Sequence, residues 1–292
     1  MNENKKYNII FNPNANRGGS KQSIVDLVSL FEKNDMHYAL HRTTGPGHAT
    51  KIAKELSDSG EKELIVVGGD GTLYEAINGV TDMNVAIIPV GTGNDVAKTI
   101  NLDTGVSVAF ELIKLDTKKF VDYAIINDNI KSLSLISFGI TSNILKKMKK
   151  FKKNRAINYY IALVHDLFSF RAKEYTVIIG DKEKKIKADF LTVHNCKYAG
   201  GGMELCNPAI INDGYLNLLI VKHVGMLRRV LNFVSVLQKK LHKQPNVKII
   251  PIKEVTILSP HDTTCSIDGE LIELSNLNVK VVPSGLSIYA PN

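Results

Sequence analysis

The first third of the chain alternates short apolar stretches with amphipathic ones, and this pattern constrains the fold more than any other feature. The predicted strands and helices follow one another in the order strand 7–11, helix 21–34, strand 38–42, helix 49–59, strand 64–67, helix 73–78 and strand 85–89. Such alternation is typical of an α/β fold with a largely parallel sheet. Parallel sheets carry their binding loops at the carboxyl ends of the strands, and the glycine-rich segments of this chain fall there.

After about Asp122 the pattern changes to strand-like runs separated by turns, at 132–138, 175–179, 190–194, 216–221, 255–258 and 279–282. The region is predicted to form a mainly antiparallel second domain, a β-sandwich or barrel-like unit. Two stretches inside it have helical periodicity, and we expect their apolar stripes to pack in the core. The stripes consist of Ile157, Tyr160, Ile161, Val164, Leu167 and Phe168, and of Leu227, Val230, Leu231, Val234 and Leu237.

Length and composition favour two domains in a reducing compartment. A chain of 292 residues with 44% hydrophobic content can bury more than one core. Cys196, Cys206 and Cys265 lack CxxC spacing, which favours small buried thiols over metal ligands or disulfides. The first residues do not follow a signal-peptide pattern, and no apolar run reaches the roughly 18 residues that span a bilayer. We therefore expect a cytoplasmic protein.

The net charge of +8 favours an anionic partner, which is a nucleotide, a nucleic acid or the acidic leaflet of a membrane. Trp is absent, and no RNP, zinc-finger or basic-zipper pattern occurs, so we expect no nucleic-acid partner.

The strongest local signal is the apolar strand that ends in Gly68, Gly69, Asp70, Gly71 and Thr72. The glycines let the backbone approach a polyphosphate, and the N-terminus of the following helix adds N–H donors. A carboxylate beside phosphates needs a divalent cation between them, so Asp70 indicates Mg²⁺. The alternative is an ordinary turn in which Asp70 caps the following helix.

Two further segments favour the phosphate-binding interpretation. A second strand ends in a glycine-rich turn with Thr92, Asn94 and Asp95, and Asn12 lies at the end of the first strand, ahead of Gly18. Neither a Walker A motif nor a GxGxxG fingerprint occurs at these strand ends. The site is therefore predicted to differ from those of P-loop enzymes and of dinucleotide-dependent dehydrogenases.

These residues resemble the diacylglycerol kinase catalytic-domain family of bacterial lipid kinases, which is related to sphingosine kinases and NAD kinases. The resemblance spans nearly the whole chain. It rests on Asn12-Pro13, on 43–49, 68–72 and 89–95, on Asp122, on 200–202, 208–209 and 213–214, and on 268–270. It implies an ATP-binding α/β domain like that of NAD kinase and phosphofructokinase at 1–122, completed by 284–292, and a β-sandwich lipid-substrate domain at 123–283.

The resemblance also implies roles for individual residues. Glu270 resembles the general base that takes the proton from a lipid hydroxyl, and Asp70 would organise the catalytic Mg²⁺. A plain hairpin with a solvated Glu270 is the alternative. The residues implied to contact ATP are Asn12, Pro13, Asn16, Thr44, Gly68, Gly69, Asp70, Gly71, Thr72 and Thr92. Asn16 stands where the family usually has glycine, and Asn tolerates positive φ.

A structural Mg²⁺ is implied near Asp213, with Ile210 and Tyr215 as carbonyl ligands and with Asp95 and Asp122 as candidates for a bridging network. The family's Asp-Asp-Gly turn reads Asn212-Asp213-Gly214 here, which leaves one carboxylate fewer. A simple Asp-Gly turn is the alternative.

Seven Lys and Arg residues between Lys146 and Arg155 alternate with Leu145, Met148 and Phe151. A helix of this composition could rest on anionic lipid, and a solvated charged face is the alternative. We expect a protein peripherally bound to the inner face of the membrane, where its lipid substrate lies. An edge strand of the second domain could also pair across a two-fold axis to form a homodimer.

Two other functions stay open. An NAD kinase shares the Gly-Gly-Asp-Gly loop and phosphorylates a soluble substrate, but its usual Asn-Glu pair is not evident here. A catalytically silent nucleotide-binding membrane scaffold would not need both Asp70 and Glu270. The sequence does not identify the lipid.

Overall fold

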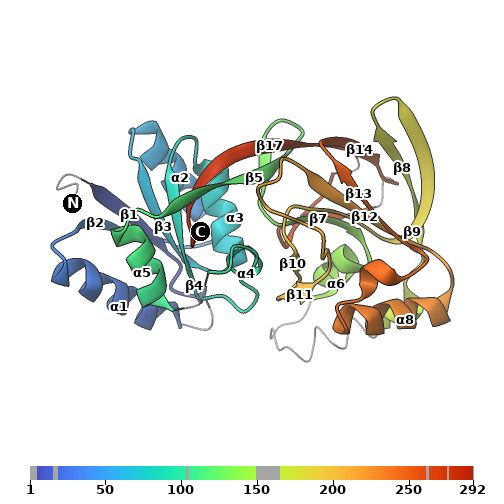
Figure 1. Cartoon of the computed structure of the whole chain (residues 1–292), viewed down its shortest axis with the longest axis horizontal. Coiled ribbons are helices and arrows are strands. Elements are labelled where there is room, and N and C mark those ends of the chain that lie inside the picture. The colour runs from blue at the N-terminus through green and yellow to red at the C-terminus, as the bar shows by residue number, and fades with distance from the viewer. Residues whose placement is uncertain are drawn as a thin grey trace. The chain divides into compact units, whose positions relative to one another are not determined.

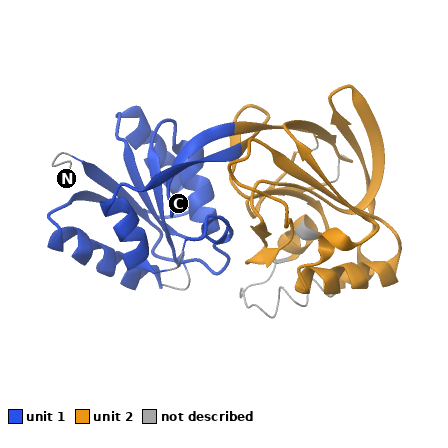
Figure 2. Ribbon diagram, viewed as in Figure 1, with its two compact units in different colours: residues 1–123, 283–292 blue, residues 124–282 orange. Residues whose placement is uncertain are grey.

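The computed structural model of the protein describes residues 5–15, 19–102, 105–148, 165–260, 263–274 and 276–291 (Figure 1). The chain divides into two compact units, one of residues 1–123 and 283–292 and the other of residues 124–282 (Figure 2). It passes between them within two strands, β5 (Lys118–Ile126) and β17 (Asn276–Tyr289). Among the described residues, no helix is both long and apolar enough to span a membrane.

The first unit is built on a parallel sheet in the order β2 (His37–Arg42), β1 (Lys6–Phe11), β3 (Glu63–Gly68) and β4 (Asn84–Pro89). Every residue of β3 is buried, as expected for a central strand covered on both faces. The predicted α/β fold is confirmed for this unit.

Five helices accompany this sheet, namely α1 (Ser20–Lys33), α2 (His48–Asp58), α3 (Asp70–Gly79), α4 (Asp95–Thr99) and α5 (Val106–Lys114). The helix α1 packs against α5, and the ring of its buried Phe31 lies 5.5 Å edge-on from that of Phe110. The helix α2 packs so closely against α3 that a Cβ on Gly79 would lie 2.3 Å from the carbonyl oxygen of Thr50. A glycine is therefore required at this helix contact.

The end of β17 joins the sheet of the first unit. Ser287 and Ile288 pair in parallel with Asn84 and Val85 of β4. The hydroxyl of buried Tyr289 donates to Glu63, with an O–O distance of 2.8 Å. Residues after 282 therefore add a parallel strand next to β4.

The second unit is a mainly antiparallel β-sandwich-like unit, as predicted. Its central strand, β9 (Lys182–His194), pairs with β7 (Leu135–Gly139), β8 (Lys173–Ile179) and β12 (Leu216–Lys222). The remaining strands are β6 (Ile130–Ser132), β10 (Tyr198–Ala199), β11 (Met203–Glu204), β13 (Val247–Ile252), β14 (Glu254–Leu258), β15 (Cys265–Ile267) and β16 (Glu270–Ile272). Its helices are α6 (Ile140–Met148), a short turn of helix at 165–169, α8 (Met226–Leu237) and the 3₁₀ turn Leu241–Lys243.

Two predictions for this unit were wrong. The single strand expected at 132–138 is interrupted after Ser132, because the N–H groups of Leu133, Ser134 and Leu135 donate to the carboxylate of Asp268 rather than to a neighbouring strand. The apolar stripe of α8 lies outside the core. Leu227 is 77% exposed and Leu237 62%, whereas Arg229 on the opposite side is buried.

Several predicted features lie outside the described residues. They are Asn16, Gly18, residues 149–155 of the basic stretch, and Ile157, Tyr160, Ile161 and Val164 of the first apolar stripe. Of that stripe, Leu167 is buried and Phe168 is exposed.

Candidate active site

The predicted nucleotide-contacting residues follow four strands of the first unit, and hydrogen bonds join these strand ends in a row. Because the sheet is parallel, the carboxyl ends of β1, β2, β3 and β4 meet at one edge. At this edge the N–H of Thr43 donates to the carbonyl of Phe11, and the N–H of Asn12 to that of Val67. The N–H of Val90 likewise donates to the carbonyl of Gly68. The structure therefore brings Asn12, Thr44, residues 68–72 and the loop of Thr92 to one edge.

Asp70 links the two glycine-rich loops. Its Oδ2 accepts the N–H of Asn94 and its Oδ1 that of Asp95, each at 2.8 Å. The carboxylate thus caps α4, which follows the other loop, and not the helix that Asp70 itself begins. Burial raises the pKa of this carboxyl group, and the backbone donors oppose the rise because they favour the charged form.

The two glycine-rich loops approach each other through their glycines. A Cβ on Gly91 would lie 2.6 Å from the Cα of Gly69, and a Cβ on Gly69 would lie 3.1 Å from the Cα of Gly91. A side chain on Gly91 would therefore require the loops to shift, and one on Gly69 would be a tight contact. Glycine is needed at position 68 for a separate reason. A Cβ there would lie 2.5 Å from the Cβ of Thr72.

Asn94, which is not among the predicted site residues, shapes the second loop. Its backbone is left-handed, with φ of +52°, and its side chain both accepts the N–H and donates to the carbonyl of Gly91, at 2.9 Å each. Asn is among the few non-glycine residues that adopt this conformation readily. The Asn that ends the sequence Gly-Thr-Gly-Asn was therefore a signal for a left-handed residue at this turn.

Asn12 and Thr44 are held by neighbouring side chains. The amide of Asn12 donates to the hydroxyl of Thr72 at 3.2 Å, so β1 and α3 are joined through two predicted site residues. The N–H of Thr44 donates to Nδ1 of His48 at 3.0 Å, and the Thr44 hydroxyl lies 2.9 Å from the same nitrogen. His48 is a further residue of this edge that is not among the predicted site residues. Pro13 is buried, and Thr92 is exposed.

In the second unit, Glu270 is an exposed residue at the start of β16, directly after a two-residue turn. The turn residues, Asp268 and Gly269, have φ values of +48° and +89°, which is the geometry of a type I′ hairpin. The Asp268 carboxylate accepts the hydroxyl of Ser132 at 2.6 Å and three backbone N–H groups at 2.8–3.0 Å. Burial raises its pKa, which these donors oppose. Asp268 therefore fixes the turn that presents Glu270.

The predicted metal residues of the second unit lie in an exposed turn. Oδ1 of Asp213 accepts the N–H of Tyr215 at 2.9 Å, and Gly214 has a φ of +76°. Ile210 is 55% and Tyr215 41% exposed. Across the part of the chain that the structure describes, no group of three or more His, Cys, Asp or Glu residues is arranged to hold a metal ion. A cation here would rely on one carboxylate, backbone carbonyls and water.

The two acidic residues expected to bridge the sites make hydrogen bonds within the first unit. Asp122 is buried and accepts the N–H of Ser284 at 2.8 Å, which ties β5 to β17 within the first unit. Asp95 is also buried, and its N–H donates to Asp70. Both residues thus take part in holding the first unit together.

Comparison with known families assigns both halves of the chain. The diacylglycerol kinase catalytic domain matches residues 6–126, and the YegS C-terminal NAD kinase beta sandwich-like domain matches residues 134–290. A probable lipid kinase YegS-like protein of Enterobacter sp. (strain 638) is 26% identical, over 94% of this chain and 93% of its own. A diacylglycerol kinase of Staphylococcus saprophyticus is 24% identical, over 99% and 96%.

A solved structure has the same fold. The crystal structure of a putative diacylglycerol kinase from Bacillus anthracis superimposes with a TM-score of 0.82 at 23% identity and covers 98% of this chain and 97% of its own. At 23% identity this likeness shows the fold alone.

Proposed function

Because this chain belongs to the diacylglycerol kinase catalytic-domain family, a family of phosphotransferases, we propose that it transfers the γ-phosphate of ATP to the hydroxyl group of diacylglycerol or a related lipid. The observation that carries the proposal is the joined row of strand ends in the first unit, in which Asp70 fastens the two glycine-rich loops together. Phosphoryl transfer depends mainly on such positioning and on charge neutralisation.

We propose that the first unit binds ATP at this edge. The first turn of α3 has N–H groups without intrahelical acceptors, and its positive dipole end favours an anion. Gly69 and Gly71 add no side chain that would keep phosphate oxygens away. Asn12, Thr44 and Thr92 supply amide and hydroxyl groups to the same ligand, with His48 and Asn94 positioning them.

Mg²⁺ is the proposed partner of the nucleotide. It is commonly held by one or two carboxylates together with substrate phosphates and water, and a partly exposed Asp70 with further lone pairs fits that need. When bound, the ion neutralises charge on the phosphates. We also propose a second, structural Mg²⁺ at Asp213. The single carboxylate of Asp213 and the carbonyls of Ile210 and Tyr215 would bind it.

Glu270 of the second unit is the proposed general base. Phosphoryl transfer to an alcohol requires a group that accepts the hydroxyl proton as the oxygen attacks, and an exposed carboxylate on a rigid hairpin can do so. The four hydrogen bonds to Asp268 keep that hairpin in one geometry. The lipid acceptor is proposed from the names of the similar proteins, which are lipid kinases and a diacylglycerol kinase.

The test is to incubate the protein with γ-labelled ATP and vesicles containing diacylglycerol, phosphatidylglycerol, a ceramide or a polyprenol, with NAD as a soluble acceptor. We expect label in a lipid product, loss of transfer with EDTA, and a higher Mg²⁺ requirement for Asp213→Ala. Label in NAD would support the NAD kinase alternative. ATP binding without transfer to any acceptor would support the silent scaffold.

A further inference from the structure

The helix α8 has its amphipathic faces reversed relative to a helix that packs on a core. Its large apolar side chains project outward, with exposed fractions of 77% for Leu227, 44% for Leu231, 40% for Val234 and 62% for Leu237. Met226, at its start, is 56% exposed. We call these five residues the outer face of α8. Their spacing places them on one side of the helix, so the apolar surface is continuous.

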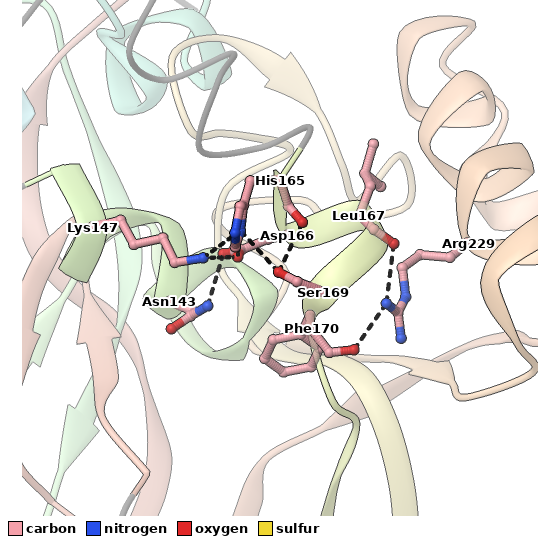
Figure 3. Close-up of polar contacts among 8 residues, drawn as sticks. All are labelled: Asn143, Lys147, His165, Asp166, Leu167, Ser169, Phe170 and Arg229. Carbon is pink, nitrogen blue, oxygen red and sulfur yellow. Dashed lines mark hydrogen bonds and ion pairs between the residues drawn. The ribbon is translucent and has the colours of Figure 1, made fainter.

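Polar side chains anchor the opposite side of α8 in the second unit, which fixes the direction of the outer face. Arg229 is buried, and Nη2 of its guanidinium donates to Asp189 at 2.6 Å. Its Nη1 donates to the carbonyls of Leu167 and Phe170 at 3.1 and 3.0 Å (Figure 3). Ser235 is buried on the same side. Turning the helix to bury its leucines would expose a desolvated ion pair and break these bonds.

The stretch of sequence that contains α8 carries only positive formal charges. Residues 214–253 contain eight Lys and Arg residues and no Asp or Glu. Lys222 and His223 precede the helix, Lys239, Lys240, His242 and Lys243 follow it, and all are exposed. An exposed apolar face flanked by basic residues is the composition of helices that lie in the interface of anionic membranes.

We propose that the outer face of α8 enters the interfacial layer of an anionic bilayer, with the flanking Lys residues on the headgroups. This inference rests on the proposed function in one respect, because a lipid acceptor gives the protein a reason to bind there. It moves the docking surface from the expected stretch at 146–155 to a helix whose side chains the structure describes.

The first test places a fluorophore on α8. In Leu231→Cys, labelled with an environment-sensitive dye, we expect a blue shift on vesicles of phosphatidylcholine and phosphatidylglycerol and none on pure phosphatidylcholine. The same label on Val25→Cys, an exposed position on α1, should not respond. The native thiols are buried, and burial raises the pKa of Cys206 to about 12 and that of Cys265 to about 11, which slows their labelling.

The second test measures sedimentation with the same vesicles, without nucleotide or lipid substrate. Leu227→Asp with Leu231→Asp should lower the partition coefficient about tenfold or more, because apolar burial is lost and two negative charges are introduced. The matched control, Val25→Asp with Val108→Asp, makes the same charge change at exposed helical positions of the first unit and should bind within about twofold of wild type.

Equal loss in both double variants, or no shift from Leu231→Cys, would overturn the proposal. So would a concentration-dependent dimer that Leu227→Asp with Leu231→Asp abolishes, since the face would then belong to a second copy. Vesicle binding by a protein that phosphorylates no lipid would refute the proposed function and leave the docking surface intact.

A cavity beneath α8 carries a second inference. It has a volume of about 110 Å³ and is lined mainly by apolar side chains, among them Ile144, Leu167, Phe190, Met203 and Val236. An engineered apolar cavity of ~150 Å³ holds benzene, so this space suits a short piece of hydrocarbon. One wall is α6, which packs against β16, the strand that begins with Glu270.

Asn232 contributes a polar side chain to the wall of this cavity. It lines the wall, is 6% exposed, and neither its Nδ2 nor its Oδ1 has a partner among the described residues. Oδ2 of Asp189 and Nε of Arg229, also on the wall, are likewise unpartnered there. Unpaired buried polar atoms cost stability, so a ligand that pairs with them gains affinity. We infer that the cavity receives part of an acylglycerol, with an ester or hydroxyl oxygen bonded to Asn232. This rests on the proposed function.

The test is Asn232→Leu, which keeps the shape and removes both unpaired atoms. We expect a higher melting temperature and about tenfold weaker binding of dioctanoylglycerol, measured by equilibrium dialysis without ATP. ATP affinity should not change. Asn246→Leu is the control, since Asn246 is equally buried but outside the cavity and donates to the carbonyl of Lys222; it should lose stability and bind the lipid as wild type does.

Unchanged dioctanoylglycerol binding by Asn232→Leu would overturn the inference, as would a loss of stability, which would assign Asn232 a structural role. If wild type binds dioctanoylglycerol but does not phosphorylate it, the cavity assignment stands and the proposed function fails.

Discussion

Replacing Glu270 with Gln is expected to lower kcat for lipid phosphorylation by about 10²–10⁴-fold, the usual contribution of a general base. The amide keeps the size of the side chain and cannot accept the hydroxyl proton. Because Glu270 is exposed at the start of β16 and the hairpin is held by Asp268, melting temperature and ATP affinity should stay at wild-type values. Steady-state kinetics with diacylglycerol vesicles and thermal unfolding check both expectations.

The chain offers a matched control for this variant. Glu273 is exposed and lies one residue beyond β16, so Glu273→Gln makes the same chemical change close by. It should keep wild-type kinetics. Equal kcat values for Glu270→Gln and wild type would refute the base assignment.

Replacing Asp70 with Asn is expected to reduce both activity and stability. An amide can accept only one of the two N–H groups that Asp70 now binds, and its own NH₂ would face the other, so one contact between the glycine-rich loops is lost. Hydrogen bonds to a charged group contribute about 1.5–3 kcal/mol each. We expect the free energy of unfolding, measured by denaturant titration, to fall by about 1.5–3 kcal/mol. We also expect at least a ~10²-fold loss in kcat/KM, as for the loss of one preorganised electrostatic contact.

Asp58→Asn serves as the comparison, because Asp58 is an exposed acid on α2 whose ion pair with Lys54 joins surface side chains. Its free energy of unfolding should change by less than about 0.5 kcal/mol. Mg²⁺ titration separates the two roles of Asp70. If Asp70 only joins the two loops, Asp70→Asn should need the same Mg²⁺ concentration as wild type. If Asp70 also binds Mg²⁺, the variant should need a higher concentration. Wild-type stability and activity in Asp70→Asn would contradict both.

The fold of the first unit was predictable because its signals are local. Each strand is a short apolar run, and each glycine-rich loop directly follows its strand, so topology alone brings Asn12, Asp70 and Thr92 to one edge. The contacts within that edge were not predictable. Asp70 meets the N–H groups of residues 94 and 95, and no pattern in the sequence pairs a carboxylate with a backbone donor on another loop.

The error on α8 has a clear physical cause. Periodicity reports that a helix has two faces and does not report which face meets the core. The buried side is chosen by Asp189, forty positions before Arg229, through an ion pair that becomes visible only in three dimensions. The interruption at Ser132 has a similar origin, since its acceptor, Asp268, lies far along the chain. Sequence patterns do not show contacts between residues this far apart in the chain.

The return of the chain to the first unit also affects how the protein is made. The strand β4 acquires its neighbour, residues 287–288 of β17, only after the whole second unit has been synthesised. At ordinary elongation rates this leaves β4 as an open edge for on the order of ten seconds. An unpaired apolar edge is a template for association with other chains. Translation order therefore leaves the nascent first unit open to association through β4, and premature termination within the second unit would leave that edge permanently unpaired.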